Sequence, residues 1–441
     1  MKRLFIITLC ITFIITGCSS QGTSLPQEDS DVVGKSPEEI VVTQGEAVEM
    51  PVQEPAKELP KEENKTTDAK AIGNESTPKV DLSKLTSKRK TSYNHFNTIC
   101  FAVVYDDFTS PSAMERFGSS WQEIQNMLSE LENDVSVNIY GSDIYKFNQA
   151  RYGESVAISD LTAEIVAQAM EMYEFTGGAY NPAVAYLVDL WGFSPRFLNH
   201  EDKTMPYDRP RNPDGSFGLP DRRYVDAFKD LSDFSGVKLS KNGNGYTLTK
   251  KVKDIEIDGV VYSLKIDLGG IAKGYGADRA AEILKKYGYD YGYVNIGLSS
   301  MKLLKRDVSP KGAPDDFMWA INMSNPDNPS ETYMTGFGKD TGVSTSGTYE
   351  NCYTVDGRKY SHIIDPFTGE PTQSDIVSVS IWGEDASYAD AITTALCVMG
   401  KEKATKFMNT RLKGYNAAFI TKTASKLELY TNMAPADYIL N

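Results

Sequence analysis

Apolar residues recur at helical spacing in several parts of the chain. Between Pro111 and Glu132 the apolar positions lie three or four residues apart: Met114, Phe117, Trp121, Ile124, Leu128 and Leu131. Side chains at this spacing share one face of a helix, so the stretch predicts an amphipathic helix. We expect further helices over 160–175, 182–191, 280–287 and 386–399.

Short β-rich runs predict strands between and after these helices. We expect one strand over 93–107, and later strands over 237–240, 246–250, 254–257, 262–267, 291–296, 301–304, 317–323, 339–346, 352–364, 376–382, 416–422 and 426–431. Residues 194–221 are polar and rich in Pro and Gly, which predicts a surface insertion. Because strands and helices mix without regular β-α-β alternation, we expect an α+β fold, a single mixed α/β domain.

The N-terminal part of the chain has a different composition. Residues 1–17 combine two basic residues with a short apolar run, which predicts a secretory signal peptide. Ile15-Thr16-Gly17-Cys18 resembles the lipobox of bacterial lipoproteins, which implies a lipid on Cys18 and a place on the extracytoplasmic face of the cell membrane; an uncleaved anchor is the alternative. Residues 18–92, without Phe, Trp or Tyr, predict a disordered tether, and 93–441 the folded domain.

Net charge and cysteine content exclude some classes of partner and of structural framework. The formal net charge is −14, which argues against nucleic acid as a partner because a phosphate backbone needs clustered Lys and Arg. Beyond Cys10 and Cys18 the chain has three cysteines, an odd number far apart in the sequence, so they predict no disulfide framework. An anionic small molecule stays possible as a ligand where a local site or a metal offsets the negative charge of the chain.

The segment Asp267–Asp278, DLGGIAKGYGAD, has two interpretations. Its glycines do not form the dinucleotide fingerprint, and no Ser or Thr follows Lys273 as in a P-loop. A Gly-Gly turn before a helix still presents backbone N–H groups to an anion, with Lys273 adding positive charge. The alternative is that small residues only let a strand and a helix pack closely.

The segment Tyr388–Ala395, YADAITTA, places two oxygen-bearing side chains on one helix face. Asp390 and Thr394 are four residues apart, so they lie one turn from each other. A carboxylate, a hydroxyl and a nearby carbonyl are the hard oxygen ligands that Mg²⁺ takes. The alternative is an Asp near a helix N-terminus and a Thr bonded back to its own helix.

Two further segments combine turns with polar groups. His362, one of three histidines, lies where an expected strand meets the turn DPFTG, so it is either a site residue or a residue that fixes its own turn. The segment Thr176–Pro182, TGGAYNP, suffices to end one helix and begin the next. Its glycines could also let a planar ring approach the backbone.

Together these segments resemble the ApbE-type flavin transferases, or FAD:protein FMN transferases. The matching blocks follow that family's order: TGGAYNPAVAYLVDLWGF, KIDLGGIAKGYGAD, STSGTYENCYTVDGRKYSHIIDPFTGEP and YADAITTALCVMG. The resemblance runs from about Phe96 to the C-terminus and implies an ApbE-type, T-fold-like domain. It also implies Mg²⁺-dependent transfer of FMN from FAD to a Thr or Ser hydroxyl of an acceptor protein, with release of AMP.

The resemblance also implies roles for individual residues. The metal ligands are the backbone carbonyl of Gly270 and the side chains of Asp390 and Thr394. His362 is expected to act as an acid/base or to orient a phosphate, and Asp390 to act in catalysis through the metal. The residues expected to contact FAD are Asn138, Ala179, Tyr180, Asn181, Asp267, Lys273, Ser346, Gly347 and His362.

The chain departs from the family's pattern in three places. It has Asn295-Ile-Gly-Leu298 where Asn-x-Gly-Gly is common, and Phe96-Asn97-Thr98 where Met-Gly-Thr is common. It has Ser136-Val137-Asn138 where the family has a Ser-Thr-Tyr segment, and Asn138 offers no aromatic face to a cofactor. Two alternatives to the transferase therefore stay open: an FAD pyrophosphatase that yields FMN and AMP, and a non-enzymatic flavin-binding surface lipoprotein.

Overall fold

The computed structural model describes residues 81–194, 219–310, 312, 314–424 and 426–441. The expected signal peptide, Cys18 and most of the expected tether and surface insertion lie outside these residues. The α-helices are α1 (Pro111–Val135), α2 (Asp143–Gln149), α3 (Asp160–Phe175), α4 (Ala185–Leu190), α5 (Arg222–Leu231), α6 (Gly269–Lys286) and α7 (Ala386–Thr410). Short 3-10 helices span Leu82–Lys84 (η1), Pro182–Val184 (η2) and Phe234–Gly236 (η4).

A sheet of eight strands organises the fold, and all its neighbouring strands are antiparallel. In spatial order the strands are β1 (Thr86–His95), β2 (Thr98–Asp106), β8 (Gly292–Ile296), β9 (Ser300–Leu304), β12 (Gly342–Gly347), β17 (Ile376–Gly383), β18 (Asn416–Lys422) and β19 (Leu427–Thr431). Alternate side chains therefore face opposite sides of the sheet, and each side has its own core.

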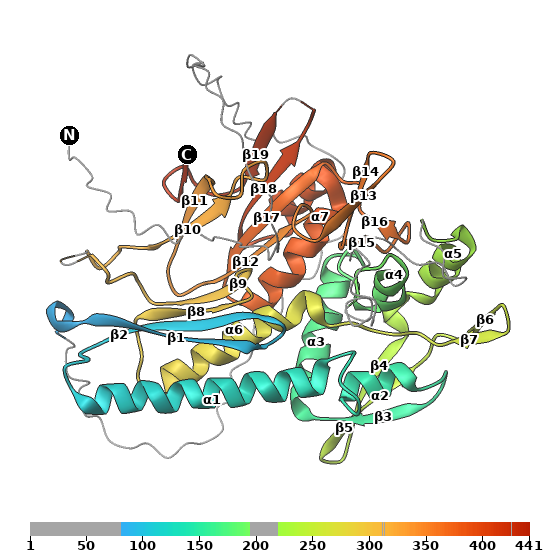
Figure 1. Ribbon diagram of the computed structural model, residues 1–441, viewed down its shortest axis with the longest axis horizontal. Helices are drawn as coiled ribbons and strands as arrows, with labels where there is room; N and C mark the ends of the chain where they lie inside the picture. The colour runs from blue at the N-terminus through green and yellow to red at the C-terminus, as the bar shows by residue number, and fades with distance from the viewer. Residues whose placement is uncertain (1–80, 195–218, 311, 313, 425) are drawn as a thin grey trace, which may run out of the picture.

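Helices cover one face of this sheet and a small sheet covers the other (Figure 1). Apolar side chains of α1 and α6 pack with Val104, Val294 and Ile296 of the sheet. On the opposite face, Met301, Leu303 and other sheet residues pack with β10 (Trp319–Ser324) and β11 (Thr332–Gly338), which pair with each other and with β20 (Tyr438–Leu440). The chain is thus a mixed α/β structure, as expected.

The remaining strands form small sheets near α2 to α5 (Figure 1). They are β3 (Ser155–Ile158), β4 (Val237–Asn242), β5 (Gly245–Lys250), β6 (Ile255–Ile257), β7 (Val260–Tyr262), β13 (Cys352–Val355), β14 (Arg358–Ser361), β15 (Ile364–Asp365) and β16 (Glu370–Pro371). β13 and β14, which fall within the run expected over 352–364, form a hairpin at Asp356-Gly357. None of the helices within the described ranges is both long and apolar enough to cross a bilayer.

Residues 82–92, expected to belong to the tether, already contain regular secondary structure. η1 begins at Leu82 and β1 at Thr86, and β1 is paired with β2 along most of its length. β1 lies at the sheet edge, and most of its side chains are exposed. Its polar sequence TSKRKTS therefore carries no apolar signal of a strand.

The single strand expected over 93–107 is instead a hairpin. β1 ends at His95 and β2 begins at Thr98, with Phe96 and Asn97 between them at φ values of 52° and 50°. A two-residue hairpin loop of this kind needs positive φ at both positions. The place where the family often has Met-Gly-Thr is therefore a tight turn that Asn97 tolerates well.

Only Tyr262 of the strand expected over 262–267 is in a strand, at the end of β7; the backbone of Ile266 pairs with a side chain instead. The Asn148 amide Nδ2 donates to the Ile266 carbonyl at 2.9 Å, and the Ile266 N–H donates to Asn148 Oδ1 at 2.9 Å. The helix expected to start after the glycines begins earlier, at Gly269, so DLGGIAKGYGAD forms the first turns of α6. α7 continues past residue 399 to Thr410 through a kink at Gly400, whose φ is 71°.

Candidate active site

The first turns of α6 lie directly against the start of α7. A Cβ atom on Gly274 would lie 2.2 Å from the Ala386 carbonyl oxygen, so the two helices meet at backbone contact distance only because residue 274 is glycine. One turn further along α6, the Asp278 carboxylate accepts hydrogen bonds from the N–H groups of Ala386 and Ser387 at 3.0 and 2.9 Å. Asp278 thereby satisfies two free N–H groups at the start of α7.

This contact brings the buried carboxylate of Asp390 onto the backbone of α6. Asp390 is 3% exposed, and its Oδ2 accepts a hydrogen bond from the Gly274 N–H at 3.2 Å. Its Oδ1 accepts from the Ser344 hydroxyl on β12 at 3.0 Å. Both oxygens keep a further lone pair, so Asp390 can still accept from a donor or bind a cation.

Gly270 and Thr394 lie together one helical turn away. A Cβ atom on Gly270 would lie 3.8 Å from Thr394 Oγ1 and 3.2 Å from the Tyr180 ring. Gly270 precedes Gly274 by one turn of α6, and Thr394 follows Asp390 by one turn of α7. The structure therefore brings together the three residues expected to bind a metal.

Tyr180 supplies a buried hydroxyl beside this group. The side chain is 3% exposed, and its hydroxyl has no hydrogen-bond partner among the described residues. Burial raises the pKa of Tyr180 well above its ordinary value, and the charges of Asp390 and Asp267 raise it further. A buried hydroxyl without a partner costs free energy, so the unpaired Tyr180 hydroxyl indicates that a ligand binds at this position.

The oxygen atoms of the group fit Mg²⁺. No group of three or more His, Cys, Asp or Glu side chains suited to a metal occurs in the described part of the chain. Mg²⁺ commonly binds through one or two carboxylates and completes its coordination with water and substrate phosphates. Asp390, the Thr394 hydroxyl and the Gly270 carbonyl match that pattern of hard ligands.

Lys273 and Asp267 place opposite charges at the start of α6. Lys273 Nζ donates to the Gly269 carbonyl at 3.1 Å, and Asp267 Oδ1 accepts from the Gly269 N–H at 2.8 Å. Burial raises the pKa of Asp267, and the charge of Lys273 opposes that rise. The Asp267 N–H donates to the Pro182 carbonyl at 2.8 Å, which joins this segment to the one that carries Tyr180.

His362 lies within reach of the Lys273 charge. Its Nδ1 is 3.2 Å from the Asn351 carbonyl oxygen, which also accepts from the His362 backbone N–H at 2.9 Å. Burial lowers the pKa of His362; the Asn351 contact opposes this effect and the Lys273 charge adds to it. With Nδ1–H donating to Asn351, the neutral ring presents Nε2 as an acceptor.

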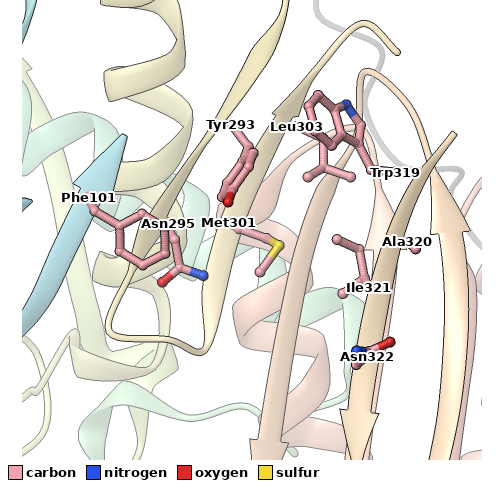
Figure 2. A pocket seen from close by; sticks show the side chains of 9 residues that line it. All are labelled: Phe101, Tyr293, Asn295, Met301, Leu303, Trp319, Ala320, Ile321 and Asn322. Carbon is pink, nitrogen blue, oxygen red and sulfur yellow. The ribbon is translucent and has the colours of Figure 1, made fainter. Parts of the chain in front are cut away.

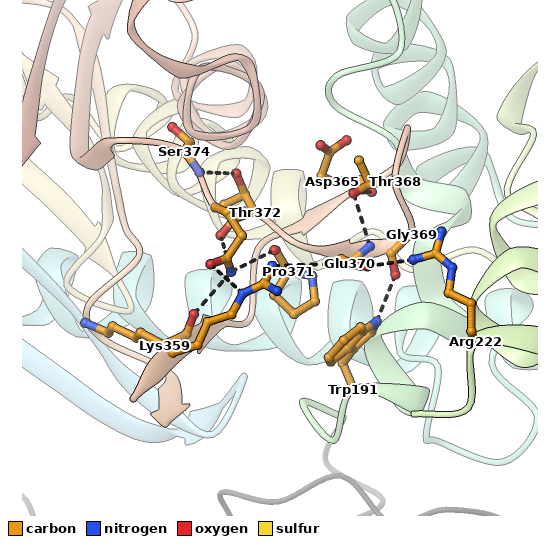
Figure 3. A network of polar contacts seen from close by, with 12 residues as sticks. Trp191, Arg222, Lys359, Asp365, Thr368, Gly369, Glu370, Pro371, Thr372 and Ser374 are labelled. Atoms are coloured by element: carbon orange, nitrogen blue, oxygen red, sulfur yellow. Dashed lines mark hydrogen bonds and ion pairs between the residues drawn. The ribbon is translucent and has the colours of Figure 1, made fainter. Parts of the chain in front are cut away.

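Hydrogen bonds and ion pairs join the turn after His362 to the end of α4 and the start of α5 (Figure 3). The Trp191 indole N–H donates to the Gly369 carbonyl at 2.8 Å. Arg222 at the start of α5 forms an ion pair with Glu370 at 2.6 Å, and Arg358 contacts the same carboxylate at 3.3 Å. These contacts fix the turn on which the position of His362 depends.

The other expected FAD residues differ in what they contact. The Ser346 hydroxyl lies 2.7 Å from the Thr393 hydroxyl, which places β12 against α7 beside Asp390 and Thr394. A Cβ on Gly347 would lie 2.8 Å from the Tyr349 ring. Ala179 is buried next to Tyr180. The Asn181 amide caps η2 and donates to the Ser232 carbonyl, so its side chain also supports the local fold.

Asn138 is not joined to this group. It is exposed in the loop between α1 and α2, and its N–H donates to Ser136 Oγ at 3.2 Å. No hydrogen bond or ion pair of the described residues links it to the residues around Asp390. The neighbouring Tyr140 is 87% exposed, so this loop does carry an aromatic side chain, two positions later.

Sequence reasoning did not single out Gly274, Asp278 or Ser344. The first two could have been found, because Gly270, Gly274 and Asp278 fall four residues apart and so share one face of a helix. Glycines in such a row weaken the helical signal and favour the prediction of a loop. Ser344 gives no such signal in the sequence, since its contact with Asp390 depends on the packing of β12 against α7.

The chain is similar to several known proteins. The model of the ApbE family matches residues 96–419. An FAD:protein FMN transferase from Vibrio cholerae is 32% identical over 284 residues, which are 64% of this chain and 73% of that protein. One from Escherichia coli strain K12 is 27% identical over 310 residues, 70% of this chain and 78% of that protein.

Solved structures show the same fold. The flavin transferase ApbE from Vibrio cholerae superposes with a TM-score of 0.61 at 26% identity, covering 79% of this chain and 97% of that one. The ApbE protein from Thermotoga maritima superposes with a TM-score of 0.61 at 25% identity, covering 78% of this chain and 96% of that one.

Proposed function

The chain belongs to the ApbE family, and on that premise we propose that it transfers FMN from FAD to a Thr or Ser hydroxyl of an acceptor protein and releases AMP. The observation that carries the proposal is the meeting of Gly270, Asp390 and Thr394 beside the unpaired hydroxyl of Tyr180. An arrangement of this kind suits a phosphoryl-type transfer, in which catalysis rests mainly on positioning and on offsetting negative charge.

We propose that the Asp390 carboxylate, the Thr394 hydroxyl and the Gly270 carbonyl hold Mg²⁺. Bound there, the ion would offset the charge of the FAD pyrophosphate and of the departing AMP. Lys273 lies one turn from Gly270 on α6 and adds a second positive charge on the same side. Its Nζ is held by the Gly269 carbonyl, which keeps it near the start of the helix.

His362 is suited to receive the proton of the acceptor hydroxyl. Its lowered pKa favours the neutral ring, and the Asn351 carbonyl on Nδ1 leaves Nε2 as the basic atom. In the proposed step the hydroxyl oxygen bonds to the FMN-side phosphorus as its proton passes to Nε2. The bond from that phosphorus to the bridging oxygen breaks, and AMP leaves.

The test is a flavinylation assay with the purified chain. FAD, Mg²⁺ and a panel of candidate acceptor proteins are incubated with the enzyme, and each acceptor is examined for in-gel flavin fluorescence and for the mass increment of FMN. We expect an increment on a Thr or Ser of one acceptor, and none with Asp390→Asn. Intact acceptors throughout the panel, with FAD bound and Mg²⁺ present, would count against the proposal.

FAD hydrolysis is the second candidate, favoured by the exposed Asn138, which offers no aromatic face to cover the cofactor. Water would then take the place of the acceptor hydroxyl. The check is to incubate the enzyme with FAD and Mg²⁺ without an acceptor and to follow FMN and AMP by chromatography. FAD that stays intact sets hydrolysis aside and leaves the transferase proposal unaffected.

Lipidation of Cys18 and attachment to the extracytoplasmic face of the membrane are further proposals. They rest on the sequence of residues 1–18. We expect the wild-type chain in the membrane fraction and Cys18→Ser in an uncleaved, non-lipidated form. Labelling with a fatty-acid analogue and mass spectrometry of the N-terminal peptide distinguish the two.

A further inference from the structure

Asn148, near the C-terminal end of α2, is hydrogen-bonded to a segment far away in the sequence. Its side chain is buried in the structure. The amide Nδ2 donates to the Ile266 carbonyl at 2.9 Å, and Oδ1 accepts from the Ile266 N–H at 2.9 Å. These two bonds replace the pair that a neighbouring antiparallel strand would supply. They therefore fix both the position and the orientation of the backbone at residue 266.

The residue held in this way directly precedes the segment that forms one side of the proposed site. The Asp267 N–H donates to the Pro182 carbonyl at 2.8 Å, and Asp267 Oδ1 accepts from the Gly269 N–H at 2.8 Å. Gly270, whose carbonyl is proposed to bind Mg²⁺, follows in the first turn of α6. The place of Gly270 at the site therefore depends on where the backbone of Ile266 is held.

The buried side chain of Lys250 in turn holds Asn148. Lys250 Nζ donates to the Ala150 carbonyl at 2.6 Å. It also lies 3.4 Å from the Asn148 carbonyl oxygen and 3.4 Å from the Ser263 hydroxyl. The end of a helix leaves carbonyl groups without partners in that helix, and Lys250 satisfies two of them. The end of α2 is thus joined to the segment 263–266 at two points, by Lys250 and by Asn148.

Another buried asparagine, Asn295 on β8, has a local role instead (Figure 2). It pairs with Phe101 of β2 on one side and with Met301 of β9 on the other. Its Oδ1 accepts from the Leu298 N–H, three residues later, at 3.0 Å. Asn295 therefore closes its own turn, whereas the two bonds of Asn148 join residues that are 118 positions apart.

We propose that Asn148 is a positioning residue for flavin transfer. Through Ile266 it holds Asp267 and the Gly270 carbonyl where FAD and Mg²⁺ bind. The inference rests on the proposed function, because it assigns a role at that site. Replacing a residue that orients metal ligands from outside the coordination sphere typically lowers metal affinity about 10- to 100-fold. Asn148→Ala should therefore weaken metal binding by about ten-fold or more.

Hydrogen exchange of the full chain without ligands tests the contact itself. The amides of residues 266–272 should exchange slowly in wild type. In Asn148→Ala they should exchange at least about ten-fold faster, because the Ile266 N–H loses its acceptor. Mass spectrometry of the peptides that cover this segment gives the rates. Rapid exchange of the segment in wild type would overturn the proposal, even if the variant does not fold.

A titration of the FAD-bound chain with Mn²⁺, followed by electron paramagnetic resonance, measures the metal site without relying on turnover. Mn²⁺ takes the same hard oxygen ligands as Mg²⁺. We expect the Kd for Mn²⁺ to rise by about ten-fold or more in Asn148→Ala. Asn148→Asp keeps the acceptor for the Ile266 N–H and loses the donor to the Ile266 carbonyl. Its Kd should therefore lie between those of wild type and Asn148→Ala.

Asn432→Ala is the matched control, because Asn432 makes the same pair of bonds after β19. Its Nδ2 donates to the Tyr415 carbonyl at 3.0 Å, and its Oδ1 accepts from the Ala417 N–H at 2.7 Å. Its loss should destabilise the chain to a similar extent and leave both the exchange of residues 266–272 and the Mn²⁺ affinity unchanged. An equal loss of affinity in Asn432→Ala and Asn148→Ala would indicate general destabilisation and overturn the proposal.

Two outcomes of the Mn²⁺ titration separate this inference from the proposed function. Wild-type affinity in Asn148→Ala would overturn the positioning role and leave the proposed function standing. A wild-type chain that binds no Mn²⁺ in the presence of FAD would overturn the proposed metal site, and the positioning role with it.

Discussion

The Gly274 N–H donates a hydrogen bond to Asp390 Oδ2, 3.2 Å away, across the contact between α6 and α7. The carboxylate expected to hold a metal is thus oriented by the backbone of a different helix. Ser344 holds the other carboxylate oxygen from the sheet, so α6, α7 and β12 fix this side chain together.

Gly274→Ala should separate these two helices. The new Cβ would lie 2.2 Å from the Ala386 carbonyl oxygen, and backbone cannot yield as a side chain can. We expect the free energy of unfolding to fall by about 1–3 kcal/mol, as for other overpacked sites, and flavin transfer to be lost. Urea denaturation and the flavinylation assay measure the two effects.

Gly118→Ala is the matched control for this change. Gly118 lies within α1, and a Cβ there would have nothing within 4 Å. Alanine should stabilise α1 by up to about 1 kcal/mol through its higher helix propensity. Equal destabilisation by the two substitutions would show that close packing at Gly274 does not matter.

Asp390→Asn should remove Mg²⁺-dependent activity while it preserves the fold. The amide oxygen can still accept one of the two hydrogen bonds, but it lacks the charge that binds a cation. We expect the rate to fall by at least about 100-fold, because metal stabilisation of the transition state is worth several kcal/mol. Rates measured across a Mg²⁺ titration provide the check, and an unchanged rate would favour a non-enzymatic flavin-binding role.

The rate should depend on pH through His362. Burial lowers the pKa of this ring below its ordinary value of 6.5, so the ring gains its proton at a lower pH than a free imidazole does. The transfer rate should therefore be level above pH 6.5 and fall as pH drops below it. A pH-rate profile of wild type against His362→Gln tests this; a rate that still rises well above pH 6.5 contradicts it.

Lys250 should make the stability of the chain rise with pH. Its side chain is fully buried, its Nζ donates to the Ala150 carbonyl at 2.6 Å, and burial lowers its pKa to about 7. Between pH 7 and the ordinary value of 10.5 the unfolded chain holds a proton that the folded chain has lost. Stability from this group therefore increases with pH across that window.

The expected gain from pH 7 to 8.5 is about 1.5–2 kcal/mol, and Lys250→Met should remove it. Lys238→Met, at an exposed position of β4, should leave the slope as in wild type. The free energy of unfolding measured by urea at several pH values distinguishes them. Identical slopes in wild type and Lys250→Met would rule out a lowered pKa.

Trp191→Phe should loosen the turn that follows His362. It deletes the indole N–H that donates to the Gly369 carbonyl at 2.8 Å and keeps most of the ring's packing. We expect stability to fall by about 1 kcal/mol and kcat for flavin transfer to fall several-fold. Trp382→Phe is the control, because the Trp382 indole nitrogen has no hydrogen-bond partner among the described residues; an equal loss of kcat in both variants would exclude a positioning role for Trp191.

The two side chains proposed to hold a metal could be singled out from the sequence because their relationship is local. Asp390 and Thr394 lie one turn apart on a helix whose apolar pattern is clear from the sequence. The exact partner of Asp390 could not be predicted, since Gly274 reaches it only after α6 and α7 have packed. The helix start was misplaced for a related reason: glycines weaken the helical signal, and here they are present because the partner helix lies so close.

Elements whose side chains face solvent were the hardest to predict. β1 carries a polar sequence on a sheet edge, and its existence depends on pairing with β2. A buried segment was also hard to predict. The residues before Asp267 have the apolar composition of a strand, yet the Ile266 backbone bonds to the Asn148 side chain from a distant part of the sequence. Long-range contacts of this kind leave no local pattern.

Gly270, Gly274 and Asp278 lie in a row on α6, so the geometry of the site depends on how many residues separate them along the helix. Each residue inserted in a helix turns everything after it by about 100°. One residue added between Gly270 and Asp278 would therefore swing Asp278 away from the N-terminus of α7. Between these three residues the number of amino acids therefore matters as much as their identity.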